Sequence, residues 1–381
     1  MEFVLKRPAQ DDETLDLFRD TVRRVVDEQL VARRENIERD GIVHRNFWTV
    51  AGAAGMLCPG VPEQWGGMGL DFRFNAVVLE ERAYAGSCLG TAIHSDIVAD
   101  YLVHYGSDTQ KARYLPKMVS GEWIGAIAMT EPNTGSDLKA IRTSAVRDGD
   151  AYILNGSKTY ITNGMSADFV IVVAKTNPAL GSKGISLLLV DCDLPGFERG
   201  RHLDKIGQHS SDTAELFFRD VRVPADHVLG EEGFGFRYLM AQLPQERLSV
   251  AIEAQAAAQR AFDEACAFTK DRQAFGKPIF DFQNSRFQLA SMATQLQVGW
   301  AHIDWAIARH VAGQLTGEEA AAAKLWHTEM QGQVTDAALQ LFGGAGYMNE
   351  YLIAQLYRDA RVSRIYAGTS EIMREVIGRA L

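Results

Sequence analysis

Cysteine is scarce in this chain of 381 residues: Cys58, Cys88, Cys192 and Cys266 are widely spaced and form no C-x-x-C pair. This spacing is typical of free thiols in a reducing compartment and argues against a disulfide or zinc framework. The start, Met1–Lys6, has neither the apolar core of a signal peptide nor an Arg/Ser-rich transit pattern. We therefore predict a cytoplasmic, bacterial protein, or a mitochondrial matrix protein if a presequence has been removed.

Long runs of apolar residues and long runs of basic residues are also missing. No stretch approaches the roughly 18 to 20 apolar residues of a membrane span, so none is predicted. The formal net charge is -10 and no long Lys/Arg run is present. A nucleic-acid partner is therefore not expected, because neutralising phosphates requires a basic face. An anionic ligand held by a few local cations is still compatible with this charge.

Several functional motifs are absent as well. The chain has no Walker sequence, no G-x-S-x-G elbow and no His/Cys pattern with metal-ligand spacing, so no metal is predicted. The glycines at 343–346 follow a helical pattern and lack the G-x-G-x-x-G spacing of a dinucleotide fold. We therefore reject NAD binding.

The spacing of apolar residues changes along the chain. Residues 1–121 show apolar residues at helical spacing, and residues 236–381 read as long helices rich in Ala, Gln and Leu. Residues 122–235 instead contain short β-rich runs, and we expect turns at Asp148-Gly149, Asn155-Gly156 and Asn163-Gly164 to separate them. The pattern predicts a helical domain, a compact antiparallel β domain and a second helical domain. The alanines at 320–323 predict a tight helix contact.

Five motifs carry a resemblance that extends almost from end to end. They are Met129–Asp137, Leu243–Leu248, Asp271–Pro278, Leu341–Tyr347 and Ile365–Ile372. In content and order they resemble the acyl-CoA dehydrogenase family. The resemblance implies a mainly α fold with a central β domain: an N-terminal helical domain, a middle antiparallel β-barrel or sandwich, and a C-terminal four-helix bundle. It also implies FAD as cofactor, an acyl-CoA substrate, an electron-transferring flavoprotein as electron acceptor, and a homotetramer built as a dimer of dimers.

One family feature is missing. Most members carry the glutamate that removes the substrate proton at the position of Ala367. The long-chain and isovaleryl branches are similar to this chain in lacking it, and they place the base on a helix that corresponds to the one carrying Glu246. A lone glutamate beside Arg247 would ordinarily be read as part of a solvated helix face. The match of Pro244–Arg247 to that branch and the missing carboxylate at position 367 favour Glu246 as the catalytic base.

The resemblance assigns further site residues. Ala367 would contribute its backbone N–H to the thioester oxygen, Tyr160 would pack on the flavin ring, and Thr162 would bond near flavin N5. The proposed cofactor-binding residues are Met129, Thr130, Gly135, Ser136, Tyr160, Ile161, Thr162, Arg272, Gln283, Gln340, Gly343, Gly344, Thr369 and Glu371. The proposed substrate-binding residues are Ser136, Pro244, Gln245, Arg247 and Gly368.

Taken alone, these segments are weak signals. Thr130–Ser136 could be an ordinary Pro-Asn turn, and an arginine such as Arg272 at a helix end is often favourable only with the helix dipole. In the family Arg272, Gln283, Gln340, Gly343 and Gly344 match positions that hold the pyrophosphate and adenosine half of FAD, some of them on a neighbouring subunit.

The resemblance thus implies an FAD-dependent dehydrogenase that introduces a trans double bond between C2 and C3 of an acyl-CoA, in fatty acid β-oxidation or related catabolism. It leans toward the long-chain branch, with the isovaleryl branch next. An acyl-CoA oxidase and a catalytically silent flavin-binding scaffold are the alternatives. Acyl chain length, branching and pathway are left open.

Overall fold

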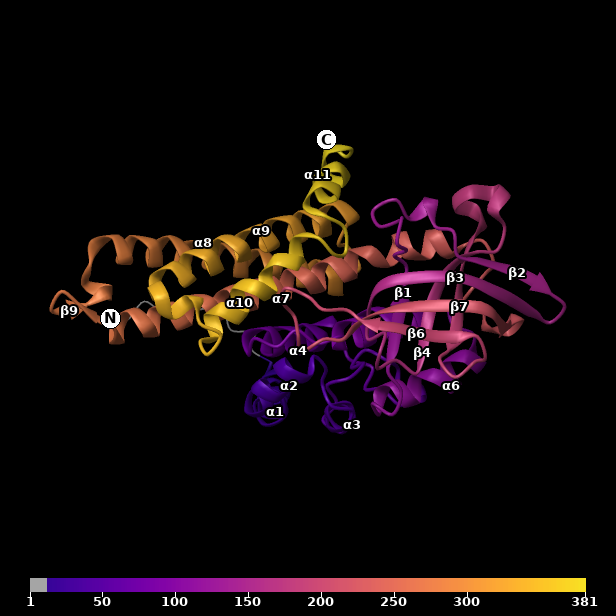
Figure 1. Ribbon diagram of the computed structural model, residues 1–381, viewed down its shortest axis with the longest axis horizontal. Helices are drawn as coiled ribbons and strands as arrows, with labels where there is room; N and C mark the ends of the chain where they lie inside the picture. The colour runs from indigo at the N-terminus through magenta and orange to yellow at the C-terminus, as the bar shows by residue number, and fades with distance from the viewer. Residues whose placement is uncertain (1–11) are drawn as a thin grey trace.

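The computed structural model describes residues 12–381, so the predictions made on Met1–Lys6 lie outside the described residues. An elongated layer of long helices connects to a β domain at one end, with shorter helices packed beneath (Figure 1). Helices α1 to α6, in the N-terminal part, are Glu13–Gln29, Arg34–Asp40, Asn46–Ala53, Phe72–Tyr84, Ala99–Tyr105 and Asp108–Val119.

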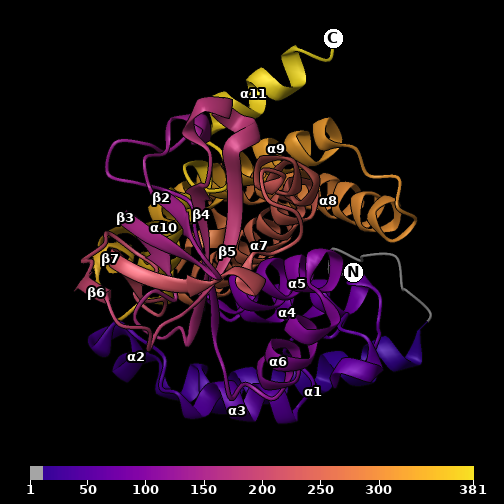
Figure 2. The ribbon, with the colours of Figure 1, turned by 90° about the vertical axis from the view of Figure 1, so that its right-hand side faces the viewer.

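Local sequence signals explain where several of these helices begin. The Asp12 side chain accepts a hydrogen bond from the backbone N–H of Leu15 at 3.2 Å and caps α1. Ser107 and Gln110 form a reciprocal capping box at the start of α6. In contrast to these surface helices, α4 is buried on nearly all sides. Figure 2 shows why: α4 lies between the outer helix α1 and the long helices α7 (Gly235–Asp271) and α8 (Gln283–Val311).

The middle segment forms one seven-stranded sheet in the order β1-β4-β2-β3-β7-β6, with β5 paired to β4. Strands β1 to β7 are Gly125–Ala128, Ser144–Asp148, Ala151–Thr162, Phe169–Lys175, Ile185–Asp191, Phe197–His202 and Thr213–Pro224. The predicted β domain is confirmed, but not every strand pair is antiparallel. Strand β4 runs parallel to β1 and pairs in parallel with Ser144, the first residue of β2. A parallel pair needs a long connection, and the chain provides one by building β2 and β3 between β1 and β4.

The expected turn at Asn155-Gly156 is wrong. Strand β3 continues through both residues, and the register against β7 shifts between Leu154 and Gly156. Gly156 has φ +148°, and a Cβ atom there would lie 2.5 Å from the Thr143 hydroxyl. A glycine in a strand can mark a bulge with a close backbone approach as well as a turn, and here it marks the bulge. The turn at Asp148-Gly149 does connect β2 to β3, and Asn163-Gly164 follows the end of β3.

The C-terminal part is helical. Helices α7 to α11 are Gly235–Asp271, Gln283–Val311, Gly317–Phe342, Leu352–Ala360 and Ser370–Gly378, and a short hairpin, β8 Gln273–Ala274 with β9 Lys277–Pro278, separates α7 from α8. Helix α7 crosses from the bundle to the β domain, whereas α11 projects away from the bundle (Figure 1). Ala320, Ala321 and Ala323 of α9 are fully buried, which confirms the predicted helix contact.

Small side chains let α7 and α9 approach closely, since alanines also fill the buried face of α7. Among residues 12–381, no helix has both the length and the apolar character needed to cross a bilayer. The predicted domain boundaries after residues 121 and 235 stay predictions.

Candidate active site

Glu246 lies on α7 with only 6% of its surface exposed. The hydroxyl of Tyr101, on α5, donates a hydrogen bond to Glu246 Oε1 at 3.1 Å. Burial disfavours the charged carboxylate and raises its pKa to about 7, although Tyr101 and the neighbouring Arg247 oppose that shift. The predicted alternative of a solvated helix face therefore does not apply to this glutamate, and a carboxylate with this pKa can accept a proton near neutral pH.

The residue before it fastens α7 to two other elements. Gln245 donates its side-chain N–H to the carbonyl of Asp96 at 2.6 Å, within a π-helical turn at Ile93–Val98 that leads into α5. His310 Nε2, on α8, lies 2.9 Å from Gln245 Oε1. Helix α7 runs through Pro244 without ending there. These contacts fix the orientation of the helix turn that carries Glu246.

The loop before α11 has an unusual backbone. Ala367 has φ +50° and Gly368 has φ +91°, so a non-glycine residue occupies the left-handed region at the predicted position of the oxyanion N–H. Lys324, buried on α9, donates its Nζ to the Gly368 carbonyl. Thr369 accepts a hydrogen bond from the Ile372 N–H and caps α11, while Glu371 is exposed in its first turn. The loop conformation is thus held from both sides.

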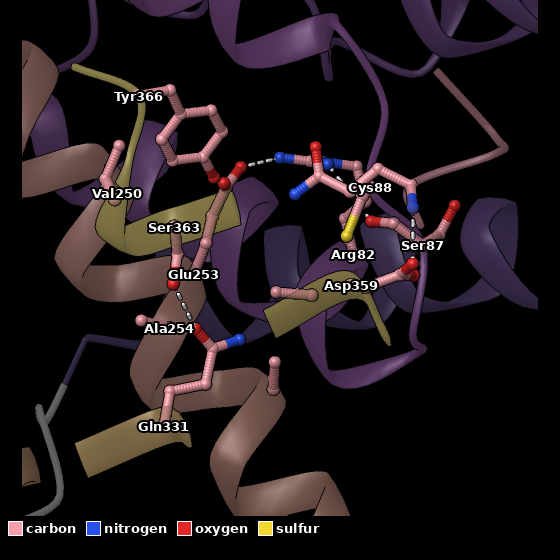
Figure 3. A pocket seen from close by; sticks show the side chains of 13 residues that line it. Arg82, Ser87, Cys88, Val250, Glu253, Ala254, Gln331, Asp359, Ser363 and Tyr366 are labelled. Atoms are coloured by element: carbon pink, nitrogen blue, oxygen red, sulfur yellow. Dashed lines mark hydrogen bonds and ion pairs between the residues drawn. The ribbon is translucent and has the colours of Figure 1, made fainter. Parts of the chain in front are cut away.

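A small cavity borders this loop, and Tyr366 is one of its lining residues (Figure 3). Arg82 of α4 pairs there with Glu253 of α7, and it also donates to the Ser87 carbonyl at 3.0 Å. Burial raises the pKa of Asp359, on α10, to about 6, and Tyr366 lines the same cavity. Residues of α4, α7 and α10 therefore line one cavity together with Tyr366, the residue that precedes Ala367.

The predicted flavin residues of the β domain lie together. The loop after β1 carries Met129, Thr130, Gly135 and Ser136, and the end of β3 carries Tyr160, Ile161 and Thr162. The Thr159 N–H donates to the Thr130 carbonyl at 2.9 Å, which joins the two segments. Buried Lys158 strengthens the junction: its Nζ lies 2.9 Å from the Met129 carbonyl and 2.9 Å from Glu131 Oε1.

The surface made by these segments can accept a flat ring. Tyr160 is 69% exposed with φ +59°, whereas Ile161 is buried. Gly135 and Ser136 are exposed, and a Cβ atom on Gly135 would meet nothing within 4 Å. An exposed aromatic ring and an exposed turn with open space at Gly135 are compatible with the flavin half of FAD.

The remaining predicted cofactor residues lie at the other end of the bundle. Arg272 is the C-cap of α7 and lies 26 positions after Glu246, or about 39 Å at 1.5 Å per residue. Gln283 begins α8. Gln340 lies in the last turn of α9, and Gly343 and Gly344 follow that helix near the same tip, where Phe268 of α7 stacks on Phe342 at 4.1 Å. One chain does not bring this group to Glu246.

This distal group is chemically suited to a phosphate ester. The side chains of Arg272, Gln283 and Gln340 are exposed, and Cβ atoms on Gly343 and Gly344 would meet nothing within 4 Å. A guanidinium beside open backbone can grip a pyrophosphate. Among the described residues, no cluster of His, Cys, Asp and Glu could hold a metal ion.

Sequence reasoning missed Tyr101, Asp96 and His310, the residues that surround Glu246 and Gln245. None belongs to a motif, and tyrosine or aspartate in a helical segment is an ordinary occurrence. Only the packing of α5 and α8 against α7 brings them to the site.

Comparison with known protein families also divides the chain into three parts. The N-terminal, middle and C-terminal domain models of acyl-CoA dehydrogenase match residues 12–122, 126–221 and 233–381. The chain belongs to the acyl-CoA dehydrogenase family. It is an FAD-dependent oxidoreductase that dehydrogenates acyl-CoA. The silent scaffold considered from the sequence is therefore set aside.

Individual relatives agree with this assignment. The mitochondrial long-chain specific acyl-CoA dehydrogenase of Sus scrofa is 46% identical over 370 residues, covering 96% of this chain and 86% of that protein. The mitochondrial isovaleryl-CoA dehydrogenase of Oryza sativa is 38% identical and covers 97% of this chain and 91% of that protein. A crystal structure of acyl-CoA dehydrogenase from Geobacillus kaustophilus is 49% identical, with a TM-score of 0.96 over 97% of this chain and 98% of that chain.

Proposed function

We propose that this acyl-CoA dehydrogenase forms the trans-2-enoyl-CoA of a long-chain acyl-CoA, with Glu246 as the base that removes the C2 proton. The observation that carries the proposal is the buried Glu246 carboxylate, whose pKa is raised to about 7. Its shielding from water makes the ionised form more basic than an exposed glutamate would be. The lack of a carboxylate at Ala367 leaves this role to α7.

The other residues have complementary roles in the proposal. The Ala367 N–H donates to the thioester oxygen as negative charge develops there. Gln245 and Pro244 keep the Glu246 turn in place, and Ser136, Arg247 and Gly368 line the path of the acyl-CoA. The bound FAD would supply the hydride acceptor for C3, and we propose an electron-transferring flavoprotein as the electron acceptor.

We further propose that the cofactor spans two subunits of a homotetramer. The Tyr160 surface would hold the flavin half, with Thr369 and Glu371 nearby. The distal group around Arg272 would hold the pyrophosphate and adenosine half bound to a neighbouring subunit. The separation of about 39 Å along α7 supports this division, because one helix carries residues of two different sites.

The preference for long chains rests on the higher identity to the long-chain relative, 46% against 38% for the isovaleryl relative. Anaerobic bleaching of the flavin by acyl-CoAs from short and branched to long and straight tests it. The fastest bleaching is expected with long straight chains. Fastest bleaching with isovaleryl-CoA would refute the preference, and rapid reoxidation of the reduced flavin by air would favour an oxidase.

A further inference from the structure

Helix α5 presents one polar contact to the proposed base. Tyr101 has no exposed surface, and its hydroxyl donates to Glu246 Oε1 at 3.1 Å. The helix begins directly after the π-helical turn whose Asp96 carbonyl accepts from Gln245. Helix α5 and the turn before it are therefore joined to α7 at two consecutive residues, Gln245 and Glu246. A π-helical turn is uncommon and often marks a functional site.

We propose that Tyr101 is a positioning residue for the base: its hydroxyl fixes one oxygen of the Glu246 carboxylate and favours the ionised form. The second oxygen, Oε2, is then the one that faces the substrate C2 proton. This inference rests on the proposed role of Glu246. It adds a residue that no motif of the chain indicates.

Other charged groups also act on the ionisation of Glu246. On α5, Asp100 opposes ionisation of Glu246, but it is paired with His104 at 3.2 Å. On α7 itself, Arg247 favours the ionised form, and burial lowers its own pKa. The other neighbouring groups are His310 of α8, whose ring contacts Gln245, and Lys324 of α9, whose Nζ contacts Gly368.

Tyr101 thus donates the hydrogen bond that offsets part of the desolvation of this carboxylate. A hydrogen bond donated to a carboxylate stabilises its ionised form and lowers its pKa by about one unit or more. Loss of the hydroxyl should therefore raise the pKa of Glu246 further. The base would then be protonated, and inactive, at a pH where the native enzyme works.

The test is Tyr101→Phe in the FAD-loaded enzyme. Single-turnover flavin reduction by one acyl-CoA is followed from acid to alkaline pH, and the midpoint of the acid limb is expected to rise by about one pH unit. Tyr105→Phe is the matched control: this tyrosine lies one turn further along α5 and stacks on Tyr238 at 4.0 Å. Its midpoint should stay at the native value.

A second measurement does not depend on turnover. The infrared band of the protonated Glu246 carboxyl, isolated by subtracting the spectrum of Glu246→Gln, is titrated without substrate. It should persist to higher pH in Tyr101→Phe. Incorporation of 3-fluorotyrosine at position 101 keeps the hydroxyl and makes it a stronger donor, so both midpoints should move to lower pH. This substitution also covers the case in which Tyr101→Phe does not fold.

The two proposals fail in different ways. If Tyr101→Phe and the fluorotyrosine protein both keep the native acid limb and infrared midpoint, Tyr101 does not position the base, while Glu246 can still be the base. If Glu246→Gln reduces its flavin as fast as the native enzyme, the base itself is misassigned. In that case the infrared titration alone would still show whether Tyr101 controls the ionisation of Glu246.

Discussion

The carboxylate of Glu246, on α7, is buried and largely shielded from water. Replacement by Gln keeps the shape and removes the proton acceptor. We expect Glu246→Gln to bind FAD normally and to reduce the flavin at least about 1,000-fold more slowly, within the range for loss of a general base. Stopped-flow anaerobic reduction measures this. Near-native reduction in a protein with full flavin content would exclude Glu246 as the base.

The same substitution has an expected effect on stability. The pKa of Glu246 is about 7 when folded, against an ordinary value of 4.5, so the folded protein binds more protons in this window. The native protein therefore loses stability as pH rises from 4.5 to 7, whereas Gln has no proton to lose. Relative to the native protein, Glu246→Gln should gain up to about 3 kcal/mol across that window. Urea unfolding below pH 4.5 and above pH 7, with saturating FAD, measures the difference in unfolding free energy between the two proteins. A difference that does not change with pH would show that the carboxylate is not buried.

Ala367 permits a sharper test, a transplant of the base. In Glu246→Ala, the added change Ala367→Glu should restore measurable flavin reduction, because the family places a carboxylate at either position. Ala367 already has φ +50°, so a new side chain there introduces little additional backbone strain. The matched control is Glu246→Ala with Ala367→Gln. Recovery should differ with acyl chain length. The side chain added at position 367 occupies space near the thioester, while Glu246→Ala leaves space beside α7.

The result of the transplant is read across a panel of acyl-CoAs. A double variant that is no faster than Glu246→Ala on every substrate, with normal fold and flavin content, would show that the two positions do not converge on one carbon.

At the scale of elements, the sequence predicted what depends on local pattern. The helix-β-helix order and the Asp148-Gly149 turn follow from periodicity and turn chemistry, and the structure confirms them. The continuation of β3 through Gly156 was missed because the reason lies in Thr143, on another segment. Tyr101 was missed for the same reason, since its role depends on α5 packing against α7. Contacts between distant segments leave no local signal.

The distal tip of the bundle, formed by the ends of α7 and α9 and the β8–β9 hairpin, allows a separate prediction. Arg272→Ala should weaken FAD retention, because it removes a charged grip on the pyrophosphate, and should leave the reduction rate of the FAD-loaded enzyme nearly unchanged. Arg286→Ala, at the start of α8, removes the same charge from an exposed side chain and serves as control. Equilibrium dialysis of FAD gives both affinities. Equal affinity in Arg272→Ala and the native protein would make Arg272 a simple helix-end residue.

At the scale of the whole molecule, the two ends of α7 belong to two different cofactor sites in our proposal. Two defective chains should therefore complement each other. A Glu246→Gln chain retains Arg272, and an Arg272→Ala chain retains Glu246. When they pair, one site combines both defects and the other combines both intact residues. A mixed dimer should thus regain about half of the native activity, as expected for a symmetric pair in which one of two sites is whole.

The measurement uses two tags for co-expression and tandem purification of the mixed oligomer, assayed at an FAD concentration that leaves pure Arg272→Ala largely empty. Pairing Glu246→Gln with Tyr101→Phe is the control, because both changes fall at the same end of the site and each mixed site keeps one defect. If the Glu246→Gln and Arg272→Ala mixture shows only the average of its parents, each chain holds FAD with its own residues. Because α7 keeps Arg272 about 39 Å from Glu246, that result would mean that Arg272 does not contact the cofactor that Glu246 serves.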